Sequence, residues 1–304
     1  MAKATAKTKG SKLPVRLENE LAQTTPDAAE LFTSVKHLPN LGDQIAVMPA
    51  VRKYWEVTGR KIKFMQCINA AGNYYPGAVH PTTTEDGTQV TMNQAMFDMM
   101  KPLIEAQPYI HSYVPYSGQP IDLDFDVIRG KTFVNLPHGA IQAWIVYAFP
   151  DLAFDLSKSW IELDGDCPEY VKEQVKGKVI LNFTERYRNG NIDYFFLKNY
   201  STDLIFAGTE REHWRFCNQW QLAIPRLNIN NFLDLGYALR EARFLLSNQS
   251  MCWNLAESIK SPRILELCQF AQNCQPMVGK DSYGFFHQVG VEYYFRLLYN
   301  QTLR

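Results

Sequence analysis

A short glycine-containing turn between a predicted strand and a predicted helix constrains the fold of this chain most. The turn is Asn40-Leu41-Gly42-Asp43, and it joins the strand predicted at Phe32 to Leu38 to an amphipathic helix at Gln44 to Val57. Such a turn brings backbone N–H groups and a side chain to the start of a helix, where an anionic ligand can bind. The pattern therefore predicts a βα unit, with Asp43 as a helix-capping residue or as a base.

A second pattern of the same kind lies in the other half of the chain. An apolar strand at Arg243 to Leu246 runs into the polar turn Ser247 to Ser250, which is followed by an amphipathic helix at Met251 to Ile259. Pro262 then marks a break before another apolar strand. The hydroxyl and amide groups of this turn are suited to holding phosphate oxygens at the start of the helix.

The segments between these patterns also alternate between strand and helix. Further strands are predicted at Lys61 to Ile68 and Ile110 to Val114, and helices at Met92 to Ala106 and around His138 to Ala148. The stretch from Ala70 to Val90 is rich in Gly, Pro, Thr and Asn, and loops of that length are usually functional or mobile. Alternation of this kind predicts an α/β protein with parallel sheets.

The length of 304 residues, with 46% hydrophobic residues, is sufficient for two domains with buried cores. We expect a basic and polar tail over residues 1–30 and a first domain over 31–168. A connection rich in Lys, Glu and Gly at 169–178 is the expected hinge, followed by a second domain at 178–288 and a terminal helix at 289–304.

Charge and cysteine content narrow the possible partners. The 31 basic and 31 acidic residues cancel, so no global field attracts nucleic acid or an anionic membrane, and an anionic ligand must be bound locally. The six cysteines lack CxxC spacing, which indicates neither a zinc site nor a disulfide framework and favours a reducing, cytoplasmic location. No apolar stretch is long enough for a transmembrane helix, and the lysine-containing start lacks the apolar core of a signal peptide.

Together the two turns resemble those of the ADP-heptose:lipopolysaccharide heptosyltransferase-like group of GT-B glycosyltransferases. That group opens with a "GD…PA" pattern, matched here by Gly42, Asp43, Pro49 and Ala50. Its second half has a polar turn, a helix with an "LA" pair and a proline before the next strand. The matching residues here are Ser247, Asn248, Gln249, Ser250, Leu255, Ala256 and Pro262. The resemblance covers roughly residues 33 to 300 in order.

The resemblance implies two Rossmann-like domains that face each other across a cleft. It also implies that the terminal helix crosses back onto the first domain, with Tyr293, Tyr294 and Phe295 at that contact. The implied activity is transfer of a sugar from a nucleotide-sugar donor to a saccharide or glycolipid acceptor, with inversion and without a metal ion or another cofactor.

The implied donor site is formed mainly by the second domain. The first strand and loop of that domain place Thr184, Arg186 and Arg188 at the diphosphate, because guanidinium groups hold phosphate oxygens bidentately. The next strand and loop contribute Gly208, with Glu210 or Glu212 accepting hydrogen bonds from ribose hydroxyls. The polar turn closes around the diphosphate with Ser247, Asn248, Gln249 and Ser250.

The implied catalytic base is Asp43, which faces the cleft from the first domain, with His80 and His138 as substitutes. Tyr74 is the candidate for stacking on an acceptor sugar, and the two histidines complete the acceptor set. Each residue also has a structural alternative, such as a surface ion pair with Glu185 for the two arginines, or a helix start for the two glutamates.

Two other functions remain open at this stage. One is a glycosyltransferase of the same fold that modifies a base in DNA, as in some bacteriophages; the basic tail and the weak global charge allow it, and a wide cleft lined by Lys and Arg would favour it. The other is a protein that binds a nucleotide or glycan without catalysis. It is motivated by the neutral Asn248, which stands where the family commonly has Asp.

Overall fold

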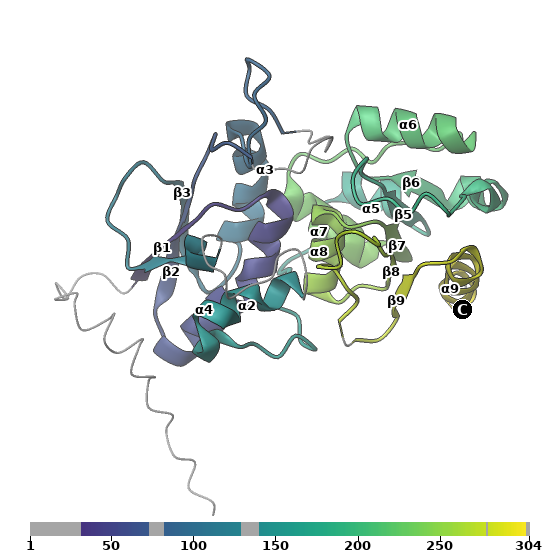
Figure 1. The fold of residues 1–304 in the computed structure, drawn as a ribbon. Helices are drawn as coiled ribbons and strands as arrows, with labels where there is room; N and C mark the ends of the chain where they lie inside the picture. Colours follow the sequence, from purple (N-terminus) through teal and green to yellow (C-terminus); the bar gives the residue numbers. More distant parts are fainter. Residues whose placement is uncertain (1–31, 73–81, 129–139, 278, 302–304) are drawn as a thin grey trace, which may run out of the picture.

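The computed structural model describes residues 32–72, 82–128, 140–277 and 279–301. These residues form a mixed α/β structure with two separate parallel sheets. In Figure 1 the sheet of the first half lies at the left and the sheet of the second half at the right, with helices of both halves between them.

The first sheet has the strand order β3-β2-β1-β4, and all of its pairings are parallel. Because β1 has β2 on one side and β4 on the other, the chain reverses its direction of winding at β1. Helices α2, α3 and α4 pack in the same core. The elements of this half are β1 (Phe32–His37), α2 (Leu41–Thr58), β2 (Lys61–Gln66), α3 (Gln94–Glu105), β3 (Ile110–Pro115), β4 (Leu123–Asp124) and α4 (Trp144–Ala148).

The sequence analysis did not predict the fourth strand, β4. Asp126, which follows β4, accepts a hydrogen bond from the Leu38 amide at 2.7 Å and contacts His37 Nδ1 at 2.9 Å. Burial by itself raises the pKa of Asp126, but the contacts with His37, Leu38 and Lys36 lower it to about 2. These contacts of Asp126 attach the segment of β4 to the end of β1.

The second sheet has the order β6-β5-β7-β8-β9, again entirely parallel. Its central strands are buried on both faces, as expected for a parallel sheet covered by helices on each side. Here the winding reverses at β5. The elements are α5 (Glu169–Val175), β5 (Val179–Asn182), β6 (Leu204–Phe206), α6 (Glu210–Trp220), α7 (Phe232–Glu241), β7 (Phe244–Ser247), α8 (Met251–Ile259), β8 (Arg263–Glu266), β9 (Ser282–Phe285) and α9 (Gln288–Gln301).

The predicted return of the terminal helix to the first domain is wrong. In the described part of α9, the buried residues Val291, Phe295 and Leu298 belong to the core of the second sheet. Phe295 packs on Phe244 of β7, and Tyr294 stacks on Tyr283 of β9. Figure 1 shows α9 beside β9, on the side of the second sheet away from the first half. Aromatic residues in this helix therefore complete the core of their own half.

The two halves share one continuous hydrophobic core, in which α2 packs on α8 and α3 packs on α7. Trp160 is fully buried within it. Its backbone N–H donates to the Ser258 carbonyl of α8 at 3.0 Å, and its indole N–H donates to the Ile45 carbonyl of α2 at 3.1 Å. The segment expected as a hinge contains helix α5, whose Val171 and Val175 are buried in the same core.

Candidate functional site

A cavity of about 360 Å³ lies where the two halves meet. Its walls come from the residues that follow β1, β5, β6 and β7, and thus from the carboxyl ends of parallel strands in both sheets. The winding of the sheets reverses at β1 and at β5, and ligands of open α/β sheets bind outside the strand ends at such points. The position of the cavity therefore marks it as the candidate binding site.

The starts of α2, α6 and α8 lie at this cavity. Leu41 and Gly42 of α2, Thr209 at the start of α6, and Met251 and Cys252 of α8 all line it. Their first backbone N–H groups and the positive ends of the helix dipoles favour an anionic ligand. Gly42 allows the close approach of α2 to α8, because a Cβ atom there would lie 3.1 Å from Asn254 Nδ2.

Two arginines add positive charge to the lining. Arg186 was predicted for this role, and it follows β5 at the reversal point. Arg226 also lines the cavity but was missed by the sequence analysis. Arg226 is exposed, and within the described ranges no ion pair or hydrogen bond of its side chain is found. The only sequence signal was a single cation directly after Pro225, outside the motifs that carry the resemblance.

Glu212 lines the cavity and is buried, while Glu210 is exposed and is not among the described lining residues. One oxygen of Glu212 accepts hydrogen bonds from the Thr209 amide at 2.9 Å and the Thr209 hydroxyl at 2.8 Å, which completes a capping box. Burial raises the pKa of Glu212, although the bonds from Thr209 and the nearby charge of Arg186 act in the opposite direction. Of the two predicted ribose contacts, the structure brings only Glu212 to the cavity.

The residues of the polar turn after β7 have two different roles: one lines the cavity, and the others support the turn. Ser250 lines the cavity and caps α8 by accepting a hydrogen bond from the Trp253 amide. Ser247 is fully buried and donates to the Asn248 carbonyl at 2.6 Å. Gln249 is buried and donates to Asn273 Oδ1 at 2.8 Å. Ser247 and Gln249 thus support the turn from behind.

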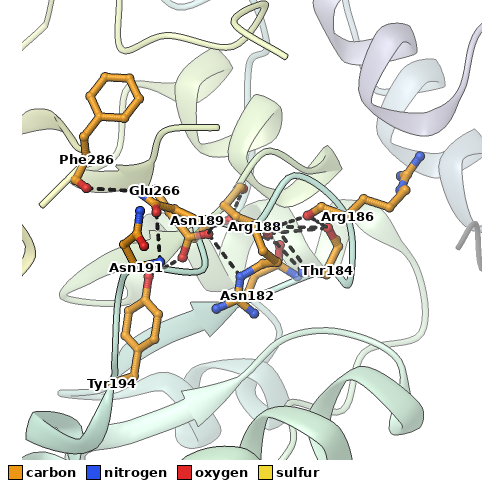
Figure 2. A network of polar contacts seen from close by, with 11 residues as sticks. Asn182, Thr184, Arg186, Arg188, Asn189, Asn191, Tyr194, Glu266 and Phe286 are labelled. Carbon is orange, nitrogen blue, oxygen red and sulfur yellow. Dashed lines mark hydrogen bonds and ion pairs between the residues drawn. The ribbon is translucent and has the colours of Figure 1, made fainter. Parts of the chain in front are cut away.

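Asn248 holds the loop that carries Arg186. Its side-chain oxygen accepts from the Thr184 amide at 2.9 Å, and its side-chain nitrogen donates to the Arg186 carbonyl at 2.5 Å. Thr184 itself lines the cavity. In Figure 2 the Arg186 side chain extends away from this network of contacts. An amide performs both functions, whereas an ionised Asp has no hydrogen to donate.

Arg188 is placed away from the predicted diphosphate contact. Its Nε atom donates to the fully buried Glu266 at 3.1 Å, and its guanidinium lies 4.8 Å from the centre of the Phe183 ring. Glu266 also accepts hydrogen bonds from the Asn189 amide and the Tyr194 hydroxyl, both at 2.5 Å (Figure 2). Arg188 is not among the described residues that line the cavity, so its charge serves to balance a buried carboxylate.

Asp43 lies in the first turn of α2 and is half-buried. The alternative role as N-cap is wrong, because the cap position belongs to Asn40. Asp43 directly follows Gly42 but is not among the described lining residues. Its charge contributes to a raised pKa of Cys274, after the larger effect of burial, which places it near the loop that follows β8. Tyr74, His80 and His138 lie outside the described residues.

Apolar side chains form much of the remaining cavity wall, which also includes Asn40, Thr82 and Asn182. Met96 and Met99 of α3 contribute from the first half, and Leu227, Ile229 and Phe232 contribute from the second half. A cavity that combines an apolar wall with converging amides and cations suits a ligand that has a flat apolar part and an anionic part.

The described parts of the chain contain no group of three or more His, Cys, Asp or Glu residues placed to hold a metal ion. They also contain no helix with the length and apolar character needed to span a membrane.

No family model and no curated protein matches the sequence. Among solved structures, the fold is similar to that of the E. coli heptosyltransferase WaaC with ADP, with a TM-score of 0.52, 10% identity, and coverage of 87% of this chain and 99% of WaaC. WaaC with ADP-2-deoxy-2-fluoro heptose gives a TM-score of 0.50 at 9% identity over the same shares. A glycosyltransferase of family 9 from Veillonella parvula DSM 2008 gives 0.48 at 11% identity, over 77% of this chain and 79% of its own.

The chain has a Rossmann-like α/β fold similar to that of WaaC. The two parallel sheets and the likeness to WaaC confirm the predicted mixed α/β class, and WaaC is a heptosyltransferase, the kind of enzyme whose motifs the sequence resembles. At such low identity the likeness concerns the fold, and the activity has to be argued from the residues of the cavity.

The hydrogen bonds by which Asn248 holds the loop of Arg186 can be tested by substitution. We expect Asn248→Asp to lower the free energy of unfolding by about 2–4 kcal/mol, because the new carboxylate faces the Arg186 and Thr184 carbonyls without a hydrogen to donate. Chemical denaturation at pH 7 measures the change. A variant as stable as the wild type would show that Asn248 does not hold this loop.

Proposed function

We propose that this protein is a glycosyltransferase that uses a nucleotide-sugar donor, and that the cavity between its halves binds the nucleotide. The main support is the convergence of the starts of α2, α6 and α8 on a cavity that Arg186 also lines. The WaaC structures of similar fold were solved with ADP and with ADP-2-deoxy-2-fluoro heptose, which supports a nucleotide-linked ligand for this fold.

The proposed arrangement is of the GT-B type, with the donor on the second half and the acceptor on the first. The diphosphate lies against the start of α8 and Arg186, and Glu212 accepts hydrogen bonds from ribose hydroxyls through the oxygen that its capping box does not use. Growing negative charge on the leaving diphosphate is then stabilised by fixed N–H groups and a guanidinium. We propose that this positive charge makes a metal ion unnecessary, so that EDTA leaves the rate unchanged.

The proposed reaction is a single displacement. The acceptor hydroxyl oxygen forms a bond to the anomeric carbon, the bond from that carbon to the diphosphate oxygen breaks, and the hydroxyl proton passes to Asp43. Attack from the side opposite the leaving group inverts the anomeric configuration. The acceptor is proposed to be a saccharide or a glycolipid, and the location to be cytoplasmic.

Nucleotide binding by matched arginine variants tests the donor site. We expect Arg186→Ala to weaken the binding of nucleoside diphosphates by about 1.5–3 kcal/mol, because a charged hydrogen bond to phosphate is lost. Arg188→Ala should leave the affinity nearly unchanged and lower the free energy of unfolding by about 2–3 kcal/mol, because Glu266 loses its ion-pair partner. Calorimetric titration and denaturation of both variants separate these effects.

A thermal-shift panel of ADP-, UDP-, GDP- and CMP-linked sugars on the wild type precedes these titrations, since a bound donor raises the melting temperature by mass action. Absence of a shift with every donor at millimolar concentration would contradict the proposed function. An unchanged affinity in Arg186→Ala would instead contradict the placement of the diphosphate.

The role of Asp43 is tested by turnover. We expect Asp43→Asn to preserve folding and donor affinity while lowering the rate of transfer by about 10²–10⁴-fold, because an amide cannot accept the proton. The measurements are the rate of transfer with the donor identified by the panel, and the melting temperature. Unimpaired turnover in this variant would leave Asp43 with a structural role in the first turn of α2 only.

A further inference from the structure

A buried asparagine, Asn254 of α8, contacts three segments that meet beside the cavity. Its side-chain oxygen accepts a hydrogen bond from Gln142 Nε2 of the first half at 3.1 Å, and its side-chain nitrogen donates to the Ser250 carbonyl at 3.3 Å. A Cβ atom at Gly42 would lie 3.1 Å from that nitrogen, so the start of α2 packs directly against this amide. Asn254 and Gln142 are both buried, and little water competes for the hydrogen bond between them.

The loop that follows β8 makes a second connection between the halves. Gln249 Nε2 donates to the Asn273 side-chain oxygen at 2.8 Å, and the Ile141 amide donates to the Asn273 carbonyl at 2.9 Å. Ile141 and Gln142 are successive residues of the short 3₁₀ helix η2 (Ile141–Ala143). Two neighbouring residues of the first half are therefore bonded to the polar turn after β7 and to α8, one through Asn273 and one directly.

Asp43 lies at the edge of this group of buried amides. It directly follows Gly42 in the first turn of α2. Burial raises the pKa of Cys274 to about 12, and the charge of Asp43 acts in the same direction. Contacts of the thiol with the Gln249 and Asn254 side chains act in the opposite direction. The Cys274 thiol thus has the Asp43 carboxylate and the Asn254 amide as common neighbours.

The remainder of the contact between α2 and α8 belongs to the hydrophobic core. Apolar contacts between helices tolerate small shifts, whereas a buried hydrogen bond is made in one arrangement only, and buried polar groups can fix the register of an interface in this way. Neither Asn254 nor Gln142 is among the described residues that line the cavity. Their effect on a bound substrate is therefore exerted through the residues that they hold.

We propose that Asn254, held by Gln142, is a positioning residue for sugar transfer. In this role it sets the distance between the polar turn after β7, which closes on the donor, and the turn of α2 that carries Asp43. The inference rests on the proposed function, since it assigns a role in the same reaction.

Removal of either amide tests this role. We expect Asn254→Ala and Gln142→Ala each to lower kcat by about 10–100-fold, because a misplacement of about 1 Å between reacting groups costs up to about that much. The affinity for the nucleoside diphosphate should stay nearly unchanged, because neither side chain lines the cavity. The measurements are transfer kinetics with the donor that the thermal-shift panel identifies, and titration calorimetry of the corresponding nucleoside diphosphate.

The variant that combines both substitutions tests whether the two side chains act as a pair. Its kcat should be no lower than that of the slower single variant, because both substitutions remove the same hydrogen bond. Effects that multiply would mean that Gln142 acts independently, and would overturn its role in holding Asn254.

Asn189→Ala is the matched control. Asn189 is another buried asparagine of the second half, and its side-chain nitrogen donates to the Phe286 carbonyl at 2.9 Å, away from the described cavity lining. This variant should lower the melting temperature as Asn254→Ala does, yet keep the wild-type kcat. An equal loss of kcat in the control would show that weakened folding causes the effect, and would overturn the positioning role.

The remaining outcomes separate this inference from the proposed function. Unchanged kcat in Asn254→Ala, or a loss of nucleotide affinity as large as the loss of kcat, overturns the positioning role while the donor site stands. If the wild type transfers no sugar from any donor that it binds, the proposed function fails and the inference fails with it.

Discussion

The packing of Trp160 between α2 and α8 fixes the relative positions of these two helices, which both begin at the cavity. Its fully buried side chain occupies the contact between the two halves, and its hydrogen bonds reach the backbone of both helices. The Tyr109 hydroxyl donates to its carbonyl at 2.5 Å, and the Lys260 ammonium lies 4.8 Å from its ring centre. Loss of an aromatic side chain at such a position typically costs about 3–5 kcal/mol. Because α2 and α8 both start at the cavity, this contact also fixes the distance between its opposite walls.

The shared core restrains motion of the two halves against each other. Domains that meet across a wet, polar interface move easily against one another, whereas a large apolar interface restrains them. Here α2 packs on α8 and α3 packs on α7 within one hydrophobic cluster. A nucleotide therefore meets amides, cations and an apolar wall that are already in position, and preorganised groups lose little entropy on binding.

Local signals allowed the sequence to predict much of the fold. The helix Met251–Ile259 begins and ends as expected because its cap, Ser250, and its apolar spacing are local features. Helix α2 ends at Thr58, one residue beyond its predicted end at Val57, and Gly59 closes it with a φ of 71°. By contrast, β4 depends on contacts of Asp126 with residues 88 and 89 positions earlier, and such contacts leave no periodic pattern.

The candidate site was predictable to a similar degree. Thr184, Arg186, Gly208, Glu212 and Ser250, which the motifs assigned to one donor site, all line the cavity, and their contacts with a donor remain predictions. The sequence could not separate Arg186 from Arg188, because the partner of Arg188 is Glu266, 78 residues away. Arg226 was missed because it belongs to no motif, and only the pairing beside β6 brings it to the cavity.

The central claim is that the cavity between the halves is the nucleotide site. Hydrogen–deuterium exchange with and without a saturating nucleotide tests this claim most directly. We expect a tightly bound nucleoside diphosphate to slow exchange at residues 41–42, 184–186, 208–210 and 250–252, which line the cavity or adjoin its lining. Peptides from the outer helix α9 should be unchanged. Tight binding without protection of these segments, or with protection confined to another part of the chain, would contradict the placement of the nucleotide between the two halves.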